Sequence, residues 1–530
     1  MEKTEKKFNL IDEPWIKVLL TDSKTEEVSL RDALVNAHMY RDLAGELPTQ
    51  DAAMLRLMLA VLHTVFSRVD ENGEPSPLTR RNAAKRWEAL WKRGSFPAEA
   101  IDNYLAEWHE RFWLFHPERP FFQVPEAAEG TAYGAPKLNG ELSESGNKVR
   151  LFPKRSGSGK ESLTYAEAAR WLVNVVNYDD ASLKKPSPTM GWLGKLGLIV
   201  PTGNNLFETL MLNLIFLRDG TEEWGEQRPT WEINNPRTET DRAKCAIHIP
   251  DNPAELYTTQ FRRVLLKEKD GYVTDFHDRS GDWFPDEDVL NGFAEQMTMW
   301  RKEKSKTGND YKPKTLNPSV QIWREFGSIA SKDESSRTPG SVIWTEKVSK
   351  IIGKDRMIRF KAIGVQYGNM NSSIDSVYSD SLSFHTALLG ELGKSWRVAV
   401  NEQISRCDRI AERIGWLASD LVKAEGGDSD RQKDAAAKCR EQFYYRIDAP
   451  FRAWLGSLDP ENGDIKAKAE EWQERSLQIA REMGREMIDS AGQAAYIGRI
   501  VKKDAKDKGQ YYSAPKSYNQ FLINLNQIDN

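Results

Sequence analysis

The chain has 530 residues, of which 75 are basic and 79 acidic, so its formal net charge is −4 at pH 7. This length exceeds the size at which a single hydrophobic core stops growing, which predicts two or three domains. The near balance of charge excludes a uniformly basic nucleic-acid-binding protein, so any surface for nucleic acid must be a local patch.

Cysteine usage and the N-terminal sequence predict the compartment. Cys245, Cys407 and Cys439 lie far apart in the chain, which excludes a disulfide framework and a zinc-knuckle spacing. The charged N-terminal segment contains no apolar run long enough for a signal peptide or a membrane span. We therefore expect a soluble, cytoplasmic protein with no membrane partner.

The first elements combine a hairpin and a helix. Residues 8–20 are typical of a strand interrupted by Pro14, and the chain turns and returns at 26–30, which predicts a short hairpin. Apolar residues at helical spacing predict a helix over 51–68. An aromatic cluster follows, and we expect it to lie in the core: Trp108, Phe112, Trp113, Phe115, Phe121 and Phe122.

Between residues 125 and 160 the composition shifts to Gly, Ser, Lys and Glu, which predicts a loop. Within it, Leu151 and Phe152 stand beside Lys154 and Arg155. Such cations bind phosphates, and an exposed ring can stack on a base. The sequence equally allows an alternative in which Phe152 tucks into the core.

A helix is predicted over 165–176, and small residues and two prolines then stop any regular element. The resulting loop contains Ala181, Ser182, Lys184 and Lys185. Small side chains next to lysines let the backbone approach a phosphodiester closely. An ordinary solvated surface loop is the alternative for this stretch.

The strongest hairpin signal in the chain lies at 261–274, where Asp270 and Gly271 separate two runs rich in β-formers. Lys267 and Lys269 precede that turn. These lysines are candidates for DNA phosphate contacts, and the alternative is that they only solvate an edge strand.

Between residues 365 and 374 an apolar run breaks into small polar residues. We expect a protruding tip here, followed directly by a long helix. Gly368 and the neighbouring asparagines tolerate the left-handed turns that a tip needs. The residues expected to project are Asn369, Met370, Asn371 and Ser372. An ordinary inter-domain loop is the alternative.

From about residue 379 the pattern changes to long helices. Apolar residues from Val400 to Leu421 alternate steps of four and three, as in a helix packed in a bundle. Further helices are predicted over 431–455 and 464–488, with 515–528 or the segment before it as a fourth. We therefore predict an α+β protein with a large mixed domain over 1–378 and a C-terminal four-helix bundle over 379–530.

No catalytic constellation is visible in the sequence. The seven histidines form no His-x-x-x-His pair, no cluster with cysteines and no nucleophile elbow. We therefore expect no catalytic residue, no metal site and no cofactor, and we do not expect an enzyme. Two other classes stay open: a nuclease or nucleotide-dependent enzyme, and a helical scaffold protein without a direct nucleic-acid role.

Several motifs resemble the CasA large-subunit family of type I-E CRISPR Cascade complexes. They are Asn-Leu-Ile-Asp-x-Pro-Trp-Ile at 9–16, His-Pro-x-x-Pro-Phe-x-Gln at 116–123, Gly-Trp-Leu-Gly at 191–194 and the polar tip before the helical region. Their order and spacing cover nearly the whole chain, which makes the resemblance specific even where a single motif is weak.

This resemblance implies a non-catalytic DNA-recognition subunit of an RNA-guided CRISPR surveillance complex. Such a subunit reads the protospacer-adjacent motif in the duplex minor groove, starts strand separation for guide RNA pairing and supports recruitment of the helicase-nuclease. The implied partners are double-stranded target DNA, the CRISPR guide RNA with the other Cascade subunits, and the helicase-nuclease effector.

The resemblance also assigns roles to the loops. The tip from Asn369 to Ser372 would be the motif wedge, and the loop with Ala181, Ser182, Lys184 and Lys185 would line the minor groove. Lys267 or Lys269 would contact DNA from the hairpin, and Leu151, Phe152, Lys154 and Arg155 would reach the guide RNA or neighbouring subunits. The chain departs from many family members at Asn371, where they have Gln, and at Ala181 and Ser182, where they have Gly.

Overall fold

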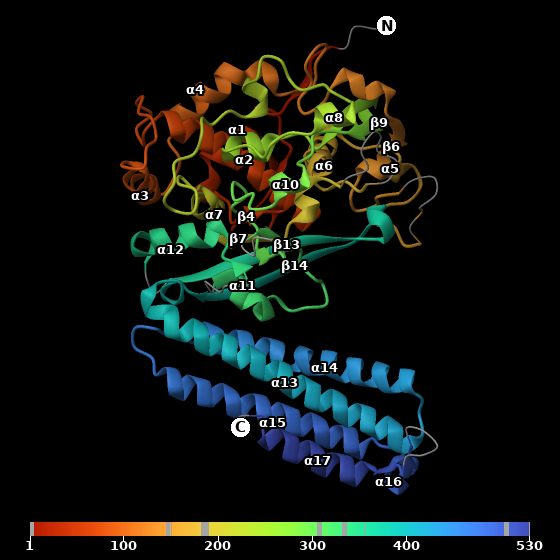
Figure 1. Cartoon of the computed structure of the whole chain (residues 1–530). Coiled ribbons are helices and arrows are strands. Elements are labelled where there is room, and N and C mark those ends of the chain that lie inside the picture. Colours follow the sequence, from red (N-terminus) through yellow and green to blue (C-terminus); the bar gives the residue numbers. More distant parts are fainter. Residues whose placement is uncertain are drawn as a thin grey trace. The chain divides into compact units, whose positions relative to one another are not determined.

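The computed structural model describes residues 5–144, 149, 151–181, 190–304, 310–330, 336–353, 356–502 and 508–528. The chain divides into two compact units (Figure 1). Unit 1 comprises Met1–Val320, Lys332–Lys354 and Ile358–Leu382, and unit 2 comprises Gln321–Ser331, Asp355–Met357 and Ser383–Asn530. Unit 1 mixes helices and small sheets and unit 2 is mainly helical, so the predicted α+β class is confirmed.

Unit 1 contains most of the short elements. Its strands before residue 165 are β1 (Lys7–Asn9), β2 (Ile16–Leu19), β3 (Thr25–Val28), β4 (Asp42–Leu43), β5 (Trp113–Phe115) and β6 (Thr131–Gly134). Its helices there include α1 (Leu30–Val35), α2 (Pro48–Arg68), α3 (Ala83–Arg93), α4 (Ala98–Trp108) and α5 (Ala135–Leu138). Later come β7 (Leu198–Thr202), α7 (Leu206–Asn213), α8 (Arg242–Cys245), α9 (Pro253–Thr258), α10 (Asp286–Val289), β10 (Trp300–Lys302), β11 (Tyr311–Pro313), β12 (Ser336–Arg337) and α12 (Gly340–Ile352).

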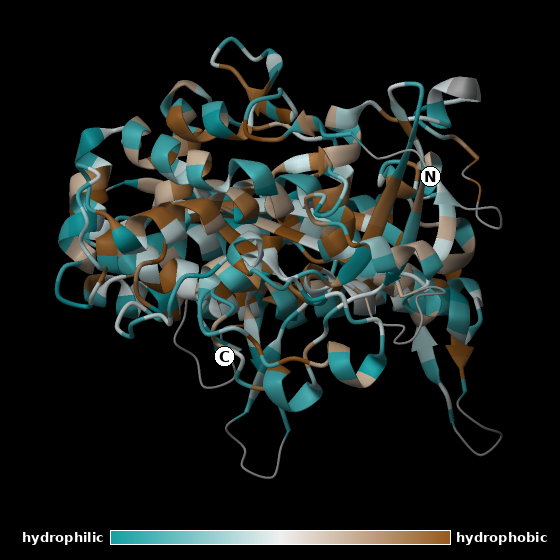
Figure 2. Cartoon of the chain, turned by 90° about the horizontal axis from the view of Figure 1, so that it is seen from above, coloured by the Kyte–Doolittle hydropathy of each residue, from teal (hydrophilic) through white to brown (hydrophobic). Residues whose placement is uncertain are grey.

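The predicted N-terminal hairpin and first long helix are confirmed. β2 pairs antiparallel with β3, with Ile16 opposite Val28. Helix α2 starts three residues earlier than predicted because Pro48 fits its first turn, where no N–H is needed. It is buried along nearly its whole length. Figure 2 shows hydrophobic residues in brown, in helices as well as in strands.

Helix α6 (Tyr165–Tyr178) organises the central part of unit 1. It begins with a capping box in which Thr164 and Glu167 each bond the other's backbone N–H. Its residue Arg170 is buried, donates to the carbonyl oxygen of Trp15 at 2.7 Å, and forms an ion pair with Glu46 at 2.7 Å. Arg170 thus fixes the N-terminal sheet against α6.

The predicted Asp-Gly hairpin is confirmed as β8 (Arg262–Lys269) and β9 (Tyr272–Ser280), with Lys269 opposite Tyr272. Asp270 has φ 52° and Gly271 has φ 83°. Two successive residues with positive φ are what a two-residue hairpin turn requires, and Asp-Gly is among the few pairs that adopt it readily. Strand β6 extends this sheet in the order β6-β9-β8.

The tip at 365–374 joins two long strands, and the expectation that a helix follows it directly is wrong. β13 (Met357–Tyr367) and β14 (Ile374–His385) are neighbours in a sheet of order β14-β13-β7 and form the two long arrows in Figure 1. Residues 374–385 combine serines and aspartates with β-branched and aromatic residues in rough alternation. That period of two marks a strand, and the helical pattern begins only after it.

Unit 2 contains the short helix α11 (Phe326–Ala330) and, in its C-terminal part, α13 (Lys394–Glu425), α14 (Ser429–Gly456), α15 (Ile465–Asp489), α16 (Gln493–Ile497) and α17 (Ala514–Asn526). Four of them, α13, α14, α15 and α17, pack along one another, so the predicted four-helix bundle is confirmed and α17 is its fourth member. The predicted break after α13 occurs at Gly426, whose φ of 89° ends the helix in a left-handed cap.

No helix in the described part of the chain is both long and apolar enough to cross a bilayer.

The ion pairs of Glu46 generate a prediction about acid stability. Burial raises the pKa of this carboxyl, but hydrogen bonds from Arg170 and Lys17 outweigh that effect and lower the pKa from 4.5 to about 2. Because the folded pKa is depressed, the stabilisation is complete above pH 4.5 and is lost as the pH falls from there toward 2. A shift of this size corresponds to about 3 kcal/mol.

We therefore expect Glu46→Gln to lower the midpoint of urea unfolding at pH 7 and to flatten its decline between pH 5 and pH 3. Glu13→Gln, which removes an exposed carboxylate at the surface, serves as the control. If the urea midpoint of Glu46→Gln declined with acid as steeply as that of the wild type, the lowered pKa could not be assigned to Glu46.

Candidate nucleic-acid interface

The tip residues form the short turn η8 (Asn369–Asn371) between β13 and β14. Met370 is 85% exposed and has φ 55° and ψ 25°, and Asn371 also has φ 55°. A left-handed conformation is common for Asn but uncommon for Met, and such backbone strain costs about 1–3 kcal/mol and clusters at functional sites. The tip therefore presents an apolar side chain from a strained backbone position.

Gly368 does not supply the left-handed turn that its sequence suggested. Its φ is −72°, and the left-handed positions fall on Met370 and Asn371 instead. A Cβ at this position would lie 2.6 Å from both the Ser373 side-chain oxygen and an Asp375 carboxylate oxygen. A larger residue here would have to displace these two side chains.

Two hydrogen bonds fasten the tip to the end of α6. The Ala181 N–H donates to the carbonyl oxygen of Asn371 at 2.8 Å. The Tyr367 hydroxyl donates to the carbonyl oxygen of Tyr178 at 2.6 Å, and burial raises the pKa of this hydroxyl well above its usual value. The predicted wedge and the start of the predicted minor-groove loop therefore lie side by side.

A buried charge cluster fixes the position of that loop. Asp179 accepts from the Arg262 guanidinium at 2.8 Å, and Asp180 accepts from the Lys137 ammonium at 2.6 Å. These four side chains are at most 8% exposed. Removing one member of a buried pair leaves an uncompensated charge, which costs about 3–5 kcal/mol, so the cluster resists rearrangement.

The Gly-Trp-Leu-Gly segment closes the same loop from its other end. The Gly191 N–H donates to the carbonyl oxygen of Asp179 at 3.0 Å. A Cβ on Gly191 would lie 2.1 Å from the carbonyl oxygen of Asn177, and one on Gly194 would lie 2.0 Å from the Tyr367 hydroxyl oxygen. Both glycines of the motif are therefore required by close packing beneath the tip.

The loop's own candidate residues divide into two groups. Ala181 is 6% exposed and its N–H is engaged by Asn371, so its backbone donor holds the tip. Ser182, Lys184 and Lys185 lie outside the described residues.

The hairpin lysines lie at the opposite end of α6. Glu268, between Lys267 and Lys269, forms an ion pair with Lys7 and accepts a hydrogen bond from Tyr165, the first residue of α6. Both lysines are exposed, and neither ammonium group pairs with a side chain in the described part of the chain. Since α6 has 14 residues, its own two ends are about 20 Å apart.

The segment with Leu151 and Phe152 is also near the start of α6. Arg155 donates to Glu167 of the capping box at 2.6 Å, and Lys154 pairs with Glu141. Leu151 is 90% exposed and Phe152 is 95% exposed, so the alternative in which Phe152 tucks into the core is wrong. An exposed Leu-Phe pair beside cations is available for stacking or for packing against a partner.

Sequence reasoning missed the buried charges beneath the surface. Lys137, Asp180 and Arg262 come from three distant segments, and their individual sequence contexts are typical of exposed charges. The one available signal was the pair of adjacent arginines at the start of β8, because successive residues of a strand point to opposite faces and one of the two must turn inward. The structure buries both Arg262 and Arg263. Among the described residues, no group of three or more side chains is arranged to hold a metal ion.

The comparison with known proteins supports a family assignment. The family model of the CRISPR-associated protein Cse1 matches residues 9–483. This chain belongs to the Cse1 family. A CRISPR-associated protein CasA/Cse1 from Thermus thermophilus is 35% identical over 502 residues, covering 90% of each chain.

Solved structures agree with this fold. The crystal structure of Thermobifida fusca Cse1 superposes with a TM-score of 0.83 at 27% identity, covering 98% of both chains. A chain of a CRISPR RNA-guided surveillance complex superposes with a TM-score of 0.70 over 99% of both chains, and at 17% identity it supports the fold alone.

The packing around Gly194 predicts the effect of one methyl group. Gly194→Ala should displace the Tyr367 ring, break its bond to Tyr178 and lower the thermal unfolding midpoint, because the new Cβ has no room. Limited proteolysis should then cut faster between residues 368 and 373. Gly159→Ala is the matched control, since a Cβ there meets nothing within 4 Å. Equal behaviour of the two variants would rule out Gly194 as a support of the tip.

Proposed function

We propose that this chain is the DNA-recognition subunit of an RNA-guided CRISPR surveillance complex and catalyses no reaction itself. Membership of the Cse1 family supports this proposal. The fold that it shares with a chain of a CRISPR RNA-guided surveillance complex is consistent with it. Its partners would be double-stranded target DNA, the CRISPR guide RNA with other Cascade subunits, and the helicase-nuclease effector.

The observation that carries the proposal is the strained, exposed tip held against the loop after α6. Met370 projects from a left-handed position, and Asn371 is bonded to Ala181. Apolar wedges of this kind unstack a base step from the minor groove, while Asn can bond the exposed base edges. Because Ala181 and Tyr178, to which the tip is hydrogen-bonded, are buried in unit 1, the tip would keep its position when it inserts into the duplex.

In the proposed mechanism, the tip and the loop with Ala181, Ser182, Lys184 and Lys185 read the protospacer-adjacent motif from the minor groove. That groove separates A·T from G·C pairs but distinguishes A·T from T·A poorly, so the motif preference should show the same degeneracy. Opening of the first base pairs then lets the guide RNA pair, and sequence specificity passes to base pairing.

The other end of α6 would bind phosphates and the guide. Lys267 and Lys269 would contact the DNA backbone, and Leu151, Phe152, Lys154 and Arg155 would contact the guide RNA or a neighbouring subunit. A separation of about 20 Å along α6 equals about six base pairs of duplex at 3.4 Å each. Tip and hairpin could therefore contact one duplex at two places about half a turn apart.

Replacing Met370 and Asn371 together with Gly tests the wedge in the assembled complex. Strand opening should slow by about tenfold or more on intact duplex, since unstacking a step costs a few kcal/mol. On a target already mismatched beside the motif, the loss should be small, because the mismatch supplies the unpairing. Opening rates are measured with 2-aminopurine next to the motif. Equal losses on both substrates would show that the tip contributes only general affinity for DNA and does not open the duplex.

Replacing Lys267 and Lys269 with Gln tests the phosphate contacts. Target binding should weaken to the same extent for every flanking motif, and the slope of log K against log salt should fall by roughly one per lost contact. Lys85→Gln is the control, because Lys85 is exposed and pairs with no described residue. Methylphosphonate substitution should place the lost contacts about six base pairs from the motif. A changed motif preference with an unchanged salt slope would assign these lysines to base reading instead.

Absence of catalysis is tested directly with the purified chain. Neither DNA nor nucleoside triphosphates should be cleaved with Mg²⁺ or Mn²⁺, and turnover that survives repurification would overturn this part of the proposal. A chain that assembles with its partners but shows no salt-dependent DNA binding would instead be a helical scaffold.

A further inference from the structure

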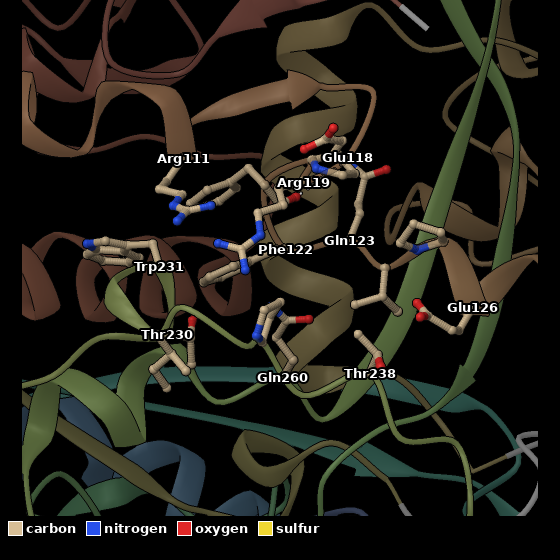
Figure 3. Close-up of a pocket in the computed structure, with 16 residues that line it drawn as sticks. Arg111, Glu118, Arg119, Phe122, Gln123, Glu126, Thr230, Trp231, Thr238 and Gln260 are labelled. Atoms are coloured by element: carbon tan, nitrogen blue, oxygen red, sulfur yellow. Dashed lines mark hydrogen bonds between the residues drawn. The ribbon is translucent and has the colours of Figure 1, made fainter. Parts of the chain in front are cut away.

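A small cavity in unit 1 lies outside the surface described above. It has a volume of about 190 Å³ and is lined by Arg111, Arg119, Phe122, Trp231 and Gln260, among others (Figure 3). These residues come from the turn after α4, the segment after β5, the turn η6 (Thr230–Glu232) and the approach to β8. The proposed DNA contacts use none of them.

Two arginines line this cavity together with the exposed carboxylates of Glu118 and Glu126, which pair with neither guanidinium. Neither the Arg111 nor the Arg119 guanidinium has a hydrogen-bond or ion-pair partner among the residues that the structure describes. Burial and the nearby Arg119 lower the pKa of Arg111, as expected for two facing cations. Like charges held together without a partner destabilise the fold, so a negatively charged ligand would relieve the repulsion.

One aromatic residue of the cavity, Phe122, has a strained backbone. Phe122 has φ 52°, which is an outlier for a bulky residue, and its ring stacks on Phe121 with centroids 4.3 Å apart and an interplanar angle of 11°. Trp231 stands on another side of the cavity (Figure 3). Strain of this kind persists where the surroundings over-determine it, and it frequently marks a binding site.

A buried acceptor completes the cavity. The side-chain oxygen of Gln260 is buried and has no hydrogen-bond partner in the described part of the chain. The backbone of Gln260 is fixed, because its carbonyl oxygen accepts from the Asp282 N–H at 3.0 Å and from Arg263 at 2.8 Å. An unpaired buried acceptor costs about 1–3 kcal/mol, and a ligand N–H would satisfy it.

These three features fit one nucleotide better than a simple anion. A cavity of about 190 Å³ is smaller than the usual pocket for a drug-sized ligand but admits one base. The exposed carboxylates Glu118 and Glu126 at the rim would repel a free phosphate dianion, whereas a phosphodiester carries one charge and brings a base to stack. A base paired in a duplex cannot turn its face into a cavity, so the nucleotide must be unpaired.

We propose that this cavity binds one unpaired nucleotide of a nucleic-acid strand. The arginines contact its phosphate, the base lies against the exposed edges of Phe122 and Trp231, whose rings are otherwise buried, and the Gln260 oxygen accepts from an exocyclic amino group. Cytosine and adenine carry such a group, and thymine and uracil lack it. The strand is either displaced DNA or RNA, because both present the same chemistry.

The test uses the full chain and fluorescent 12-mers of deoxycytidine, deoxythymidine and cytidine, followed by fluorescence anisotropy. The wild type should bind deoxycytidine about threefold or more tightly than deoxythymidine, and Gln260→Leu should abolish this preference without weakening deoxythymidine binding. The double variant Arg111→Gln with Arg119→Gln should weaken every oligonucleotide by about tenfold. Arg81→Gln, at an exposed arginine without a described partner, should change nothing.

Photo-crosslinking locates the contact independently of affinity. A 12-mer with one 5-iodocytosine should crosslink to the peptide with Phe122 or Trp231, and the crosslink should vanish in the double arginine variant while circular dichroism stays unchanged. The ratio of RNA to DNA affinity identifies which strand is preferred.

Several results would overturn the proposal. Equal loss in the double variant and in Arg81→Gln would show generic charge attraction, and a crosslink elsewhere would move the site. Displacement of the oligonucleotide by an acidic peptide, with peptide binding lost in the double variant, would assign the cavity to a protein partner. Single-strand binding is measured here without duplex, so it can succeed or fail independently of motif recognition.

Discussion

The pairing of Asp179 with Arg262 is the interaction on which the rest of the interface depends. It joins the end of α6 to the start of β8 in a site that water scarcely reaches. Its neighbour Asp180 pairs with Lys137 and adds α5 to the same point. Because buried charges tolerate little displacement, the backbone from Tyr178 to Ala181 becomes a fixed platform. The tip is bonded to this platform through Tyr367 and Asn371.

Helix α6 connects the region beneath the tip with the region of the β8–β9 hairpin. Its first turn lies near Arg155 and the β8–β9 turn, and its last turn leads to the platform under the tip. A single rigid helix of 14 residues therefore sets the spacing between the groups proposed to open the duplex and those proposed to bind its phosphates. A spacing set by a helix varies little, because every intervening backbone hydrogen bond must stretch for it to change.

The sequence predicted the elements with strong local signals. The Asp270-Gly271 turn, the helix over 165–176 and the apolar seam of α13 each follow from short-range rules of turns and periodicity, and the structure contains all three. It predicted the tip but missed the strand after it. The period of two over residues 374–385 is a weak signal, because serines and aspartates, which are poor strand formers, fill many of its positions, and pairing with β13 holds β14 in place. Pairing across the sequence is invisible to local rules.

The exposed tip residue Met370 was predicted, the exposure of Phe152 was left open by the sequence, and the buried charges were missed. Exposure of Leu151, Phe152 and Met370 agrees with their polar, glycine-rich surroundings in the sequence. The partners of Lys137 and Arg262 could not be found, because they lie 43 and 83 residues away along the chain. In the sequence, Gly194 stood out only as part of the Gly-Trp-Leu-Gly motif. The structure shows why it is glycine: a Cβ there would collide with the hydroxyl of Tyr367, which lies more than 170 residues away along the chain.

The hydrogen bond between Asp179 and Gly191 closes the loop between them through its two ends. Its two ends meet at a distance of 3.0 Å, and the closure is held by residues outside the loop. A segment closed in this way can change its length or composition at little entropic cost, since closure entropy rises only slowly with the number of residues. The hydrogen bonds that hold the tip and close the loop are formed by residues up to Ala181 and from Gly191 onward, so they do not depend on which side chains stand between those positions.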